Sequence, residues 1–451
     1  MTPPVVPQLV MVGFFPAFIR SLEQLLPPRS LTVVEDPGVY VKKPIAAMEG
    51  SFQCLTEVRL AAYQQSDEAV EEVLRIDRAH GVTGVLPGLE YAVEAAAAAA
   101  EALGLRGLGT AAARTLRDKI LLRERTVAAG MAAPVFRELR SAEDLAAFLA
   151  REPRRETVLK PANRQASLGV RFLPPDTPPE EVAAAWRATT GADEGAQIAD
   201  RPMAWRYLAE ERLDGPEISA EALVRDGRLI FLNITAKTTA DGAHPVELGH
   251  VLPAALPPAT DSALRDGMAA LIDAVGIGSG ILCAEWILTE RGPVLVECAG
   301  RCPGDSIMDL LALAWGDDFH HQLARLLRGE DPELPAAARR CAAIRFLHAG
   351  PGTITAVEGV PEARSLPGVR EVVVTAVPGH TVQGLHSSWD RLGHVVATGA
   401  TPAEALAAAE RGAARIHLAV APAAATGPAP AASVTSTASV TSTADQQRIA
   451  P

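Results

Sequence analysis

The stretch RETVLKPANRQASLGVRFLPP, residues 155–175, contains the pattern that decides the fold. Two apolar residues lead into Lys160 and Pro161, as at the end of a buried strand, and a loop of small and polar residues follows up to Gly169. Backbone N–H groups of such a loop can approach phosphate oxygens closely, while the lysine ammonium supplies positive charge. The chain has no Walker A sequence, and no Gly-x-Gly-x-x-Gly opens a helix after the first strand. A different phosphate-binding scaffold is therefore indicated.

Composition and charge restrict the class of protein and its partners. The chain has 451 residues, 48% hydrophobic and 21% charged, which is typical of a globular protein with about two to four packed units. The net charge of -12, without a basic face, argues against nucleic acid and anionic membranes as partners. Five scattered cysteines do not form a disulfide framework, and no signal peptide or membrane-spanning run is visible. We therefore expect a cytoplasmic protein.

Strand-like and helix-like segments alternate at the N-terminus. Apolar runs typical of buried strands occupy residues 9–12, 31–34 and 84–87. Helical periods lie between them, and an alanine-rich helix is predicted over 91–103, so this part should contain a parallel sheet. A further helix is predicted over 114–129, because Gly130 and Pro134 follow it.

The remainder of the chain is predicted to form further α/β units and a tail. Helices are predicted over 142–150, 179–189 and 262–275, and strands over 157–160, 207–210, 218–224 and 229–234. A strand-rich piece follows over about 341–420 and closes with an alanine-rich helix over 402–419. The last residues repeat an Ala-Ser-Val-Thr-like unit that cannot bury enough apolar surface to fold. The predicted units are residues 1–113, 114–215, 216–330 and 331–420, and a low-complexity tail over 421–451.

Two stretches carry carboxylates in informative positions. CAEWILTERGPVLVECAGR, residues 283–301, is predicted to be a hairpin in which Glu285 and Glu297 face each other across the ladder. Opposed carboxylates repel unless a cation lies between them, and oxygen ligands of this kind suit Mg2+. In EERLDGPE, residues 210–217, carboxylates flank a Gly-Pro turn, so this segment could bind an adenine edge and ribose hydroxyls; the alternative is a charged hairpin edge.

The ordered set of Asp118-Lys119 with Arg123, VLKPANRQASLGV, EERLDGPE, Glu285 and VLVECAGRCPGD resembles the ATP-grasp superfamily, in its carboxylate–amine ligase branch. The resemblance extends over residues 10–420. It implies an α/β (α+β) ATP-grasp fold, with a Rossmann-like domain before the ATP-grasp unit, a small lid subdomain, a large subdomain with the metal site, and a strand-rich C-terminal extension.

The resemblance also implies roles for individual residues, with ATP and Mg2+, or alternatively Mn2+, as cofactors. Glu285 and Glu297 would carry the metal, and Lys237 would reach the γ-phosphate. Lys119 and Lys160 would hold the phosphates under a mobile loop. Glu210 and the backbone at Glu211 and Leu213 would bind adenine, and Glu217 would bind the ribose. The implied ATP-binding set is Lys119, Lys160, Ala166, Ser167, Leu168, Gly169, Glu210, Glu211, Leu213 and Glu217.

One position departs from the superfamily pattern. Many ATP-grasp enzymes have an asparagine two residues after the second metal glutamate, where this chain has Ala299. The metal shell would then be completed by a bidentate Glu297 or by water. ECAGR is instead similar to the bacilysin-type L-amino acid ligases, which join two free amino acids.

Within that subgroup, Glu90, Glu247 and His250 would line the substrate pocket. A carboxylate such as Glu90, at the mouth of a βα unit, can receive a substrate ammonium. For His250, a satisfied core histidine is an equal alternative. Asp305 would select a polar or ammonium-bearing substrate or, as preferred here, cap a helix over 306–315.

The implied reaction is ATP-dependent activation of an amino acid carboxylate as an acylphosphate, followed by attack of the amine of a second amino acid. The product would be a dipeptide or a γ-glutamyl-type amide, in natural-product biosynthesis. The implied catalytic residues are Arg301, Lys160 and Lys237, with Arg301 binding the carboxylate and then the oxyanion. Two alternatives are a carboxylase or formyl-phosphate-type enzyme and an inactive nucleotide-binding protein. The oligomeric state stays open, with a homodimer as one option.

Overall fold

The computed structural model describes residues 6–151, 155–240 and 246–422. Its N-terminal unit is a parallel sheet in the order β3-β2-β1-β4, which confirms the predicted sheet type. Its strands are β1 (Gln8–Val12), β2 (Leu31–Glu35), β3 (Leu55–Leu60) and β4 (Val82–Pro87). Every residue of β1 and β2 is buried, as expected for parallel strands with helices on both faces.

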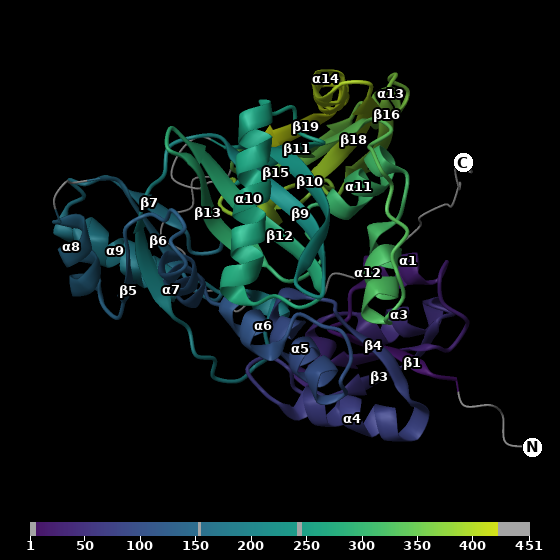
Figure 1. Ribbon diagram of the computed structural model, residues 1–451. Coiled ribbons are helices and arrows are strands. Elements are labelled where there is room, and N and C mark those ends of the chain that lie inside the picture. Colours follow the sequence, from purple (N-terminus) through teal and green to yellow (C-terminus); the bar gives the residue numbers. More distant parts are fainter. Residues whose placement is uncertain (1–5, 152–154, 241–245, 423–451) are drawn as a thin grey trace, which may run out of the picture.

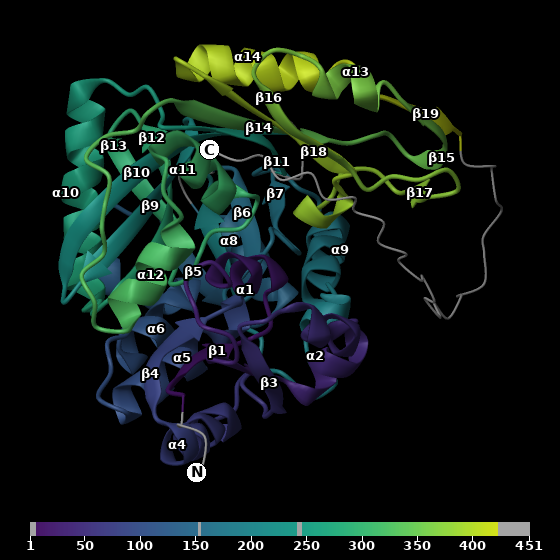
Figure 2. The same cartoon turned by 90° about the vertical axis from the view of Figure 1, so that its right-hand side faces the viewer.

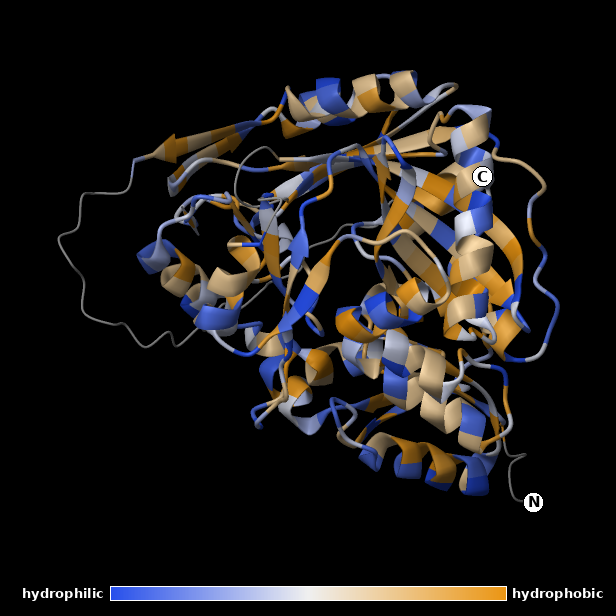
Figure 3. Ribbon diagram, turned by 60° about the vertical axis from the view of Figure 1, so that its left-hand side comes forward, coloured by the Kyte–Doolittle hydropathy of each residue, from blue (hydrophilic) through white to orange (hydrophobic). Residues whose placement is uncertain are grey.

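Helices cover both faces of this first sheet. Those of the N-terminal unit are α1 (Pro16–Leu22), α2 (Pro37–Lys42), α3 (Ile45–Met48), α4 (Glu68–His80) and α5 (Val93–Ala102). Helix α4, at the bottom of Figure 3, turns its hydrophobic side toward the sheet and its hydrophilic side outward. The opposite face packs through α1 on α12 (Phe319–Leu327), so it shares a core with the central part of the chain.

The prediction of a single helix over 114–129 is wrong. Two helices, α6 (Thr110–Leu116) and α7 (Lys119–Ala128), meet at Asp118. The Asp118 backbone is extended, and its carboxylate accepts hydrogen bonds from the N–H groups of Ile120 and Leu121 at 2.8 and 3.3 Å. An aspartate that caps the new helix competes with continuation of the old one. Lys119 therefore occupies the first turn of α7, and its N–H donates to Ala162 O at 2.9 Å.

The lid subdomain is a small antiparallel sheet with helices on one face. The strands follow the order β5-β8-β6-β7. They are β5 (Phe136–Leu139), β6 (Thr157–Pro161), β7 (Arg171–Leu173) and β8 (Tyr207–Glu211), and the helices are α8 (Ala142–Leu149) and α9 (Pro179–Thr190). Leu145, Phe148 and Val182 of the helices pack on Leu159 and Ala209 of the strands. The lid lies to one side of the central sheet in Figure 1.

A long sheet forms the centre of the molecule, in the order β13-β12-β9-β10-β11-β14-β18-β16 among the described strands. Its first five members are β9 (Glu217–Arg225), β10 (Arg228–Thr239), β11 (Glu247–Leu252), β12 (Gly280–Thr289) and β13 (Gly292–Ala299). Helix α10 (Pro258–Val275) covers one face (Figure 1), and α11 (Ile307–Trp315) and α12 pack on the other. The hairpin predicted over 283–301 corresponds to β12 and β13, and Glu285 pairs with Glu297 as predicted.

The C-terminal strands continue the same sheet. Strands β14 (Cys341–Leu347), β16 (Val369–Val374) and β18 (Gly393–Gly399) join it through β11, so 216–330 and 331–420 share one sheet. Above them in Figure 2 lie α13 (Val360–Arg364) and α14 (Pro402–Ala413). The helix predicted over 402–419 ends at Ala413, because His417–Ala421 forms strand β19. Strand β19 pairs with β15 (Gly352–Glu358), and β15 also pairs with β17 (Thr381–Val382). Tertiary pairing overrides the alanine-rich pattern there.

Two predictions concern other parts of the chain. The predicted tail lies, from residue 423 onward, outside the described residues. Among the described helices, none combines the length and the apolar character needed to cross a membrane.

Candidate active site

Strand register gathers the polar residues on one face of the central sheet. Directly paired residues share a face, because side chains alternate along each strand. Glu297 pairs with Glu285, and Glu285 pairs with Ser219 of β9. Lys237 of β10 pairs with His250 of β11. Side chains from five neighbouring strands, among them two carboxylates, a lysine and a histidine, therefore lie on this face.

Two cavities meet above this face. One, of about 340 Å3, lies between the lid and the central sheet and is lined by Lys119, Lys160 and the loop 164–168. The other, of about 370 Å3, lies between the central sheet, the N-terminal unit and the C-terminal strands. The residues that line both cavities are Gln165, Ala166, Ser167, Lys237, Glu247, Glu285 and Glu297. A group transferred from one cavity to the other would pass these residues.

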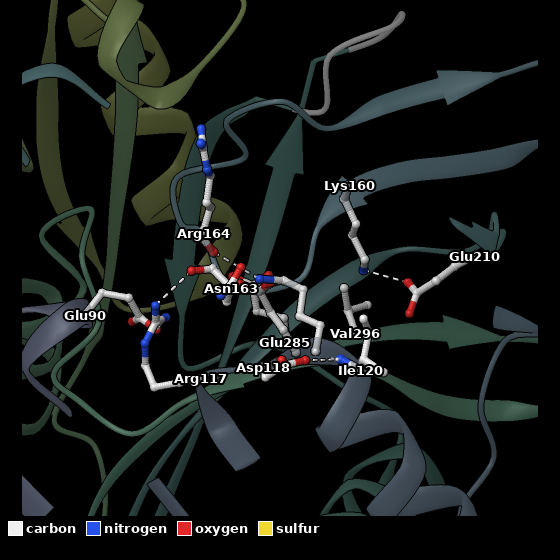
Figure 4. Close-up of polar contacts among 12 residues, drawn as sticks. Glu90, Arg117, Asp118, Ile120, Lys160, Asn163, Arg164, Glu210, Glu285 and Val296 are labelled. Atoms are coloured by element: carbon white, nitrogen blue, oxygen red, sulfur yellow. Dashed lines mark hydrogen bonds and ion pairs between the residues drawn. The ribbon is translucent and has the colours of Figure 1, made fainter. Parts of the chain in front are cut away.

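A buried ion cluster positions Lys160 at the floor of the first cavity. Lys160 Nζ lies 2.6 Å from Glu210 Oε2 (Figure 4). Arg123 Nε donates to Glu210 Oε1 at 2.7 Å. Burial raises the pKa of Glu210, but Arg123 and Lys160 outweigh that effect and hold it at about 2. Cations contact both oxygens of the Glu210 carboxylate, which therefore positions Lys160, and its contact with adenine stays a prediction. Arg123 belongs to the motif set quoted from the sequence, but the sequence predicted no role for its side chain.

The loop after β6 is shaped by left-handed residues. Ala166, Ser167 and Gly169 have φ values of 59°, 55° and 76°. Such values are unusual for residues with a Cβ, so this backbone is held in a sparsely populated conformation. Lys119 Nζ donates to Arg164 O at 3.1 Å, which ties the start of the loop to α7.

Lys237 lies at the centre of a carboxylate cluster. Its Nζ is 2.6 Å from Glu285, 2.9 Å from Glu217 and 3.5 Å from Glu247. Burial lowers the pKa of Lys237, but Glu217 and Glu285 outweigh it and hold the pKa well above the ordinary value. Burial raises the pKa of Glu285 to about 8 despite Lys237, and Glu297 adds to the rise. One lysine does not balance these carboxylates, and a further cation among them would lower the pKa of Glu285.

The donor set fits a hard divalent cation. Oxygens of Glu217, Glu247 and Glu285 lie within 4.8 Å of one another. Glu297 stands opposite Glu285, with its Oε2 2.9 Å from Lys119 Nζ. Carboxylate oxygens are the ligands that Mg2+ prefers. Glu217, which was predicted to bind ribose, and Glu247 both lie in this cluster. They are therefore candidate metal ligands in addition to the predicted pair, Glu285 and Glu297.

Glu90 and Arg301 meet in the second cavity. Arg301 Nε donates to Glu90 Oε2 at 2.5 Å, and Arg117 binds Glu90 Oε1 (Figure 4 shows Arg117 and Glu90). Burial raises the pKa of Glu90, but the two guanidinium groups outweigh that and hold it at about 2. Both Glu90 oxygens therefore contact a guanidinium group, and Glu90 fixes Arg301. Its role as the acceptor of a substrate ammonium stays a prediction.

Asp305 does not cap a helix, so the preferred interpretation of this residue is wrong. Asp305 and Ser306 both have a φ of 57°, and α11 starts at Ile307 with no side-chain cap. The Asp305 carboxylate is bound by both terminal nitrogens of Arg391 and lies 3.3 Å from His250 Nε2. His250 is buried and lines the cavity, and its Nδ1 has no hydrogen-bond partner among the described residues, so it is not a fully satisfied core histidine and its contact with substrate stays a prediction. No sequence motif pointed to Arg391, since it lies 86 residues from Asp305.

Comparisons with known proteins agree with this arrangement. The family model for an ATP-grasp domain matches residues 154–309, and the model for L-amino acid ligase C-terminal domain 2 matches residues 345–421. An alanine–anticapsin ligase of Bacillus subtilis (strain 168) is 26% identical over 293 residues, which are 60% of this chain and 59% of that protein. An uncharacterised protein of Sinorhizobium fredii is also 26% identical, over 79% of this chain and 72% of its own length.

Solved structures show the same fold. The crystal structure of an L-amino acid ligase from Bacillus licheniformis superposes with a TM-score of 0.74 at 20% identity, covering 92% of this chain and 99% of that one. A phosphoribosylglycinamide synthetase from Anaerococcus prevotii gives a TM-score of 0.63 at 15% identity, covering 92% and 100%. Residues 154–309 of the chain therefore match an ATP-grasp domain, residues 345–421 match C-terminal domain 2 of the L-amino acid ligases, and the chain has the ATP-grasp fold.

Proposed function

We propose that the protein activates the carboxylate of one amino acid with ATP and joins it to the amine of a second, releasing ADP and phosphate. The observation that carries the proposal is the junction of the two cavities at Lys237, Glu285 and Glu297, with Arg301 on the far side from the nucleotide. The similarity to L-amino acid ligases supports amino acids as the substrates. A dipeptide or γ-glutamyl-type amide for natural-product biosynthesis is the product class that we infer.

The first cavity suits the nucleotide. Lys119 and Lys160 would hold the phosphates, with the loop 166–169 closing over them and excluding water. The adenine would lie against the segment 211–213, whose residues line the cavity. Mg2+, held by Glu285 and Glu297 with Glu217 and Glu247 nearby, would supply charge neutralisation of the phosphates. Lys237 would contribute further positive charge to the transferred phosphoryl group.

The second cavity suits the amino acids. A carboxylate reacts poorly with an amine, so transfer of the γ-phosphoryl group to it, with release of ADP, first creates an acylphosphate with a good leaving group. Arg301, fixed by Glu90, would bind the carboxylate and then the oxyanion that forms when the amine attacks. The C–N bond then forms, phosphate leaves, and the amine loses a proton. Glu247, which is not saturated by cations, is the better candidate for a substrate ammonium.

The test is phosphate release from ATP and Mg2+ across a matrix of paired free amino acids, with mass spectrometry of each active well. Pair-dependent release together with a dipeptide mass would support the ligase. Release with bicarbonate or formate alone would favour the carboxylase or formyl-phosphate type, and nucleotide binding without any turnover would favour the inactive protein. Lys160→Ala, which removes a phosphate-binding cation, should abolish release in every active well.

A further inference from the structure

A short turn from the C-terminal strands reaches the second cavity. Ser387 and Asp390 form a reciprocal capping box around the turn Ser388–Asp390, which fixes its shape. Ser388 Oγ donates to Glu247 Oε2 at 3.1 Å, which ties the front of the turn to β11. The turn is therefore attached to a candidate substrate-binding carboxylate of the central sheet.

The end of the turn is attached to the cavity as well. Arg391 binds Asp305 through both terminal nitrogens, and its Nε donates to Ser388 O at 2.8 Å. Its guanidinium lies over the Phe346 ring, 3.8 Å from the centroid. The segment 387–391 is thus held on both sides by contacts that come from different strands.

Trp389 lies between these two attachments. It lines the second cavity, yet 45% of its surface is exposed. Indole is a large apolar group, and burying it against a ligand is favourable. A tryptophan that is exposed on a braced turn inside a binding cavity offers a rigid apolar surface to whatever enters.

We propose that Trp389 determines specificity by forming the wall on which an uncharged, apolar or aromatic side chain of one amino acid substrate packs. This inference rests on the proposed function. The adjacent ion pair does not call for a charged side chain, because Asp305 and Arg391 neutralise each other. The C-terminal strands would then supply part of the substrate site rather than only covering the sheet.

The test compares wild type with Trp389→Ala and Trp389→Phe, using leucine, phenylalanine, alanine and lysine as varied substrates with a fixed partner. For Trp389→Ala we expect the KM for leucine and phenylalanine to rise roughly tenfold, with the KM for alanine and for ATP changed less than about twofold. Trp389→Phe keeps an aromatic surface and should retain most of the preference. Val377→Ala, at a residue that is 60% exposed in the loop between β16 and β17, is the control and should behave as wild type.

Binding gives a readout that does not need turnover. With a non-hydrolysable ATP analogue present, leucine should change the tryptophan fluorescence of wild type, and Trp389→Phe should lose that change. Equal KM shifts for all amino acids, or none, would overturn the role of Trp389 while leaving the ligase intact, as would a preference for lysine in wild type. A wild type that neither binds nor joins any amino acid would overturn the proposed function and this inference together.

Discussion

Replacing Arg301 with lysine is expected to lower turnover without weakening ATP binding. Arg301 uses Nε to bind Glu90 at 2.5 Å and Nη1 to bind Cys302 O at 2.8 Å. Within the described residues, its Nη2 donates no hydrogen bond, so a planar pair of N–H groups is available to a carboxylate or an oxyanion. Lysine could keep the ion pair with Glu90, but it has no second branch to present to the substrate.

The magnitude follows from the donors that are lost. Removal of one oxyanion donor typically lowers kcat about 100-fold to 1,000-fold, or about 3–4 kcal/mol in the barrier. The KM for ATP should stay within about twofold, because Arg301 does not line the nucleotide cavity. The substrate carboxylate also contacts Arg301 before reaction, so the KM of the acyl donor should rise.

Steady-state kinetics on the best substrate pair would measure these effects, and Arg117→Lys provides the matched control. Arg117 binds the same Glu90 carboxylate but does not line the substrate cavity, so its replacement should lower kcat less than about tenfold. If Arg301→Lys kept near-normal turnover, the oxyanion role would be refuted. If both variants lost activity equally, the arginines would act only by holding Glu90.

Three further expectations concern the charged residues. Glu285→Gln should weaken the apparent Mg2+ affinity at least about tenfold in an activity titration, whereas Glu290→Gln, at the exposed turn of the same hairpin, should not. Glu210→Gln should lower the free energy of unfolding in urea by about 3–5 kcal/mol, because it leaves two buried cations without their anion. The free energy of unfolding of the wild type should be constant above about pH 4.5 and fall toward pH 2, because the folded pKa values of Glu90 and Glu210, about 2, lie below the unfolded value. Each of the two residues should contribute roughly 3 kcal/mol to this fall. Glu210→Gln should lack the contribution of Glu210.

Local patterns predicted the parts of the fold that short-range physics determines. The pairing of Glu285 with Glu297 was predicted by counting back from a short hairpin turn, but it also depends on a register shift between Glu285 and Trp286 that leaves Val296 without a direct partner. The parallel N-terminal sheet follows from the alternation of short, largely apolar strands with helices. The break at Asp118 was missed, although aspartate before a helical run is an N-cap signal.

Contacts between distant segments could not be predicted in the same way. Arg391 reaches Asp305 only because β18 lies beside β14, and β14 beside β11, in the central sheet. The contacts of both Glu90 carboxylate oxygens likewise depend on Arg117 and Arg301, which come from different units of the chain. A single sequence gives the type of each residue but not which partners contact its oxygens, so the pairing of Glu90 and Glu210 with arginine and lysine was not predicted.

The position of Ala299 shows how the sheet can compensate for a missing side chain. Sequence comparison looks for a further metal ligand two residues after Glu297, on the same strand, and finds a methyl group. The sheet order β12-β9-β10-β11 instead brings Glu217 and Glu247 to Glu285 from other strands, with their oxygens within 4.8 Å of one another. Oxygen donors are therefore available across the sheet rather than along the strand, and the loss of the asparagine does not by itself argue for a defective metal site.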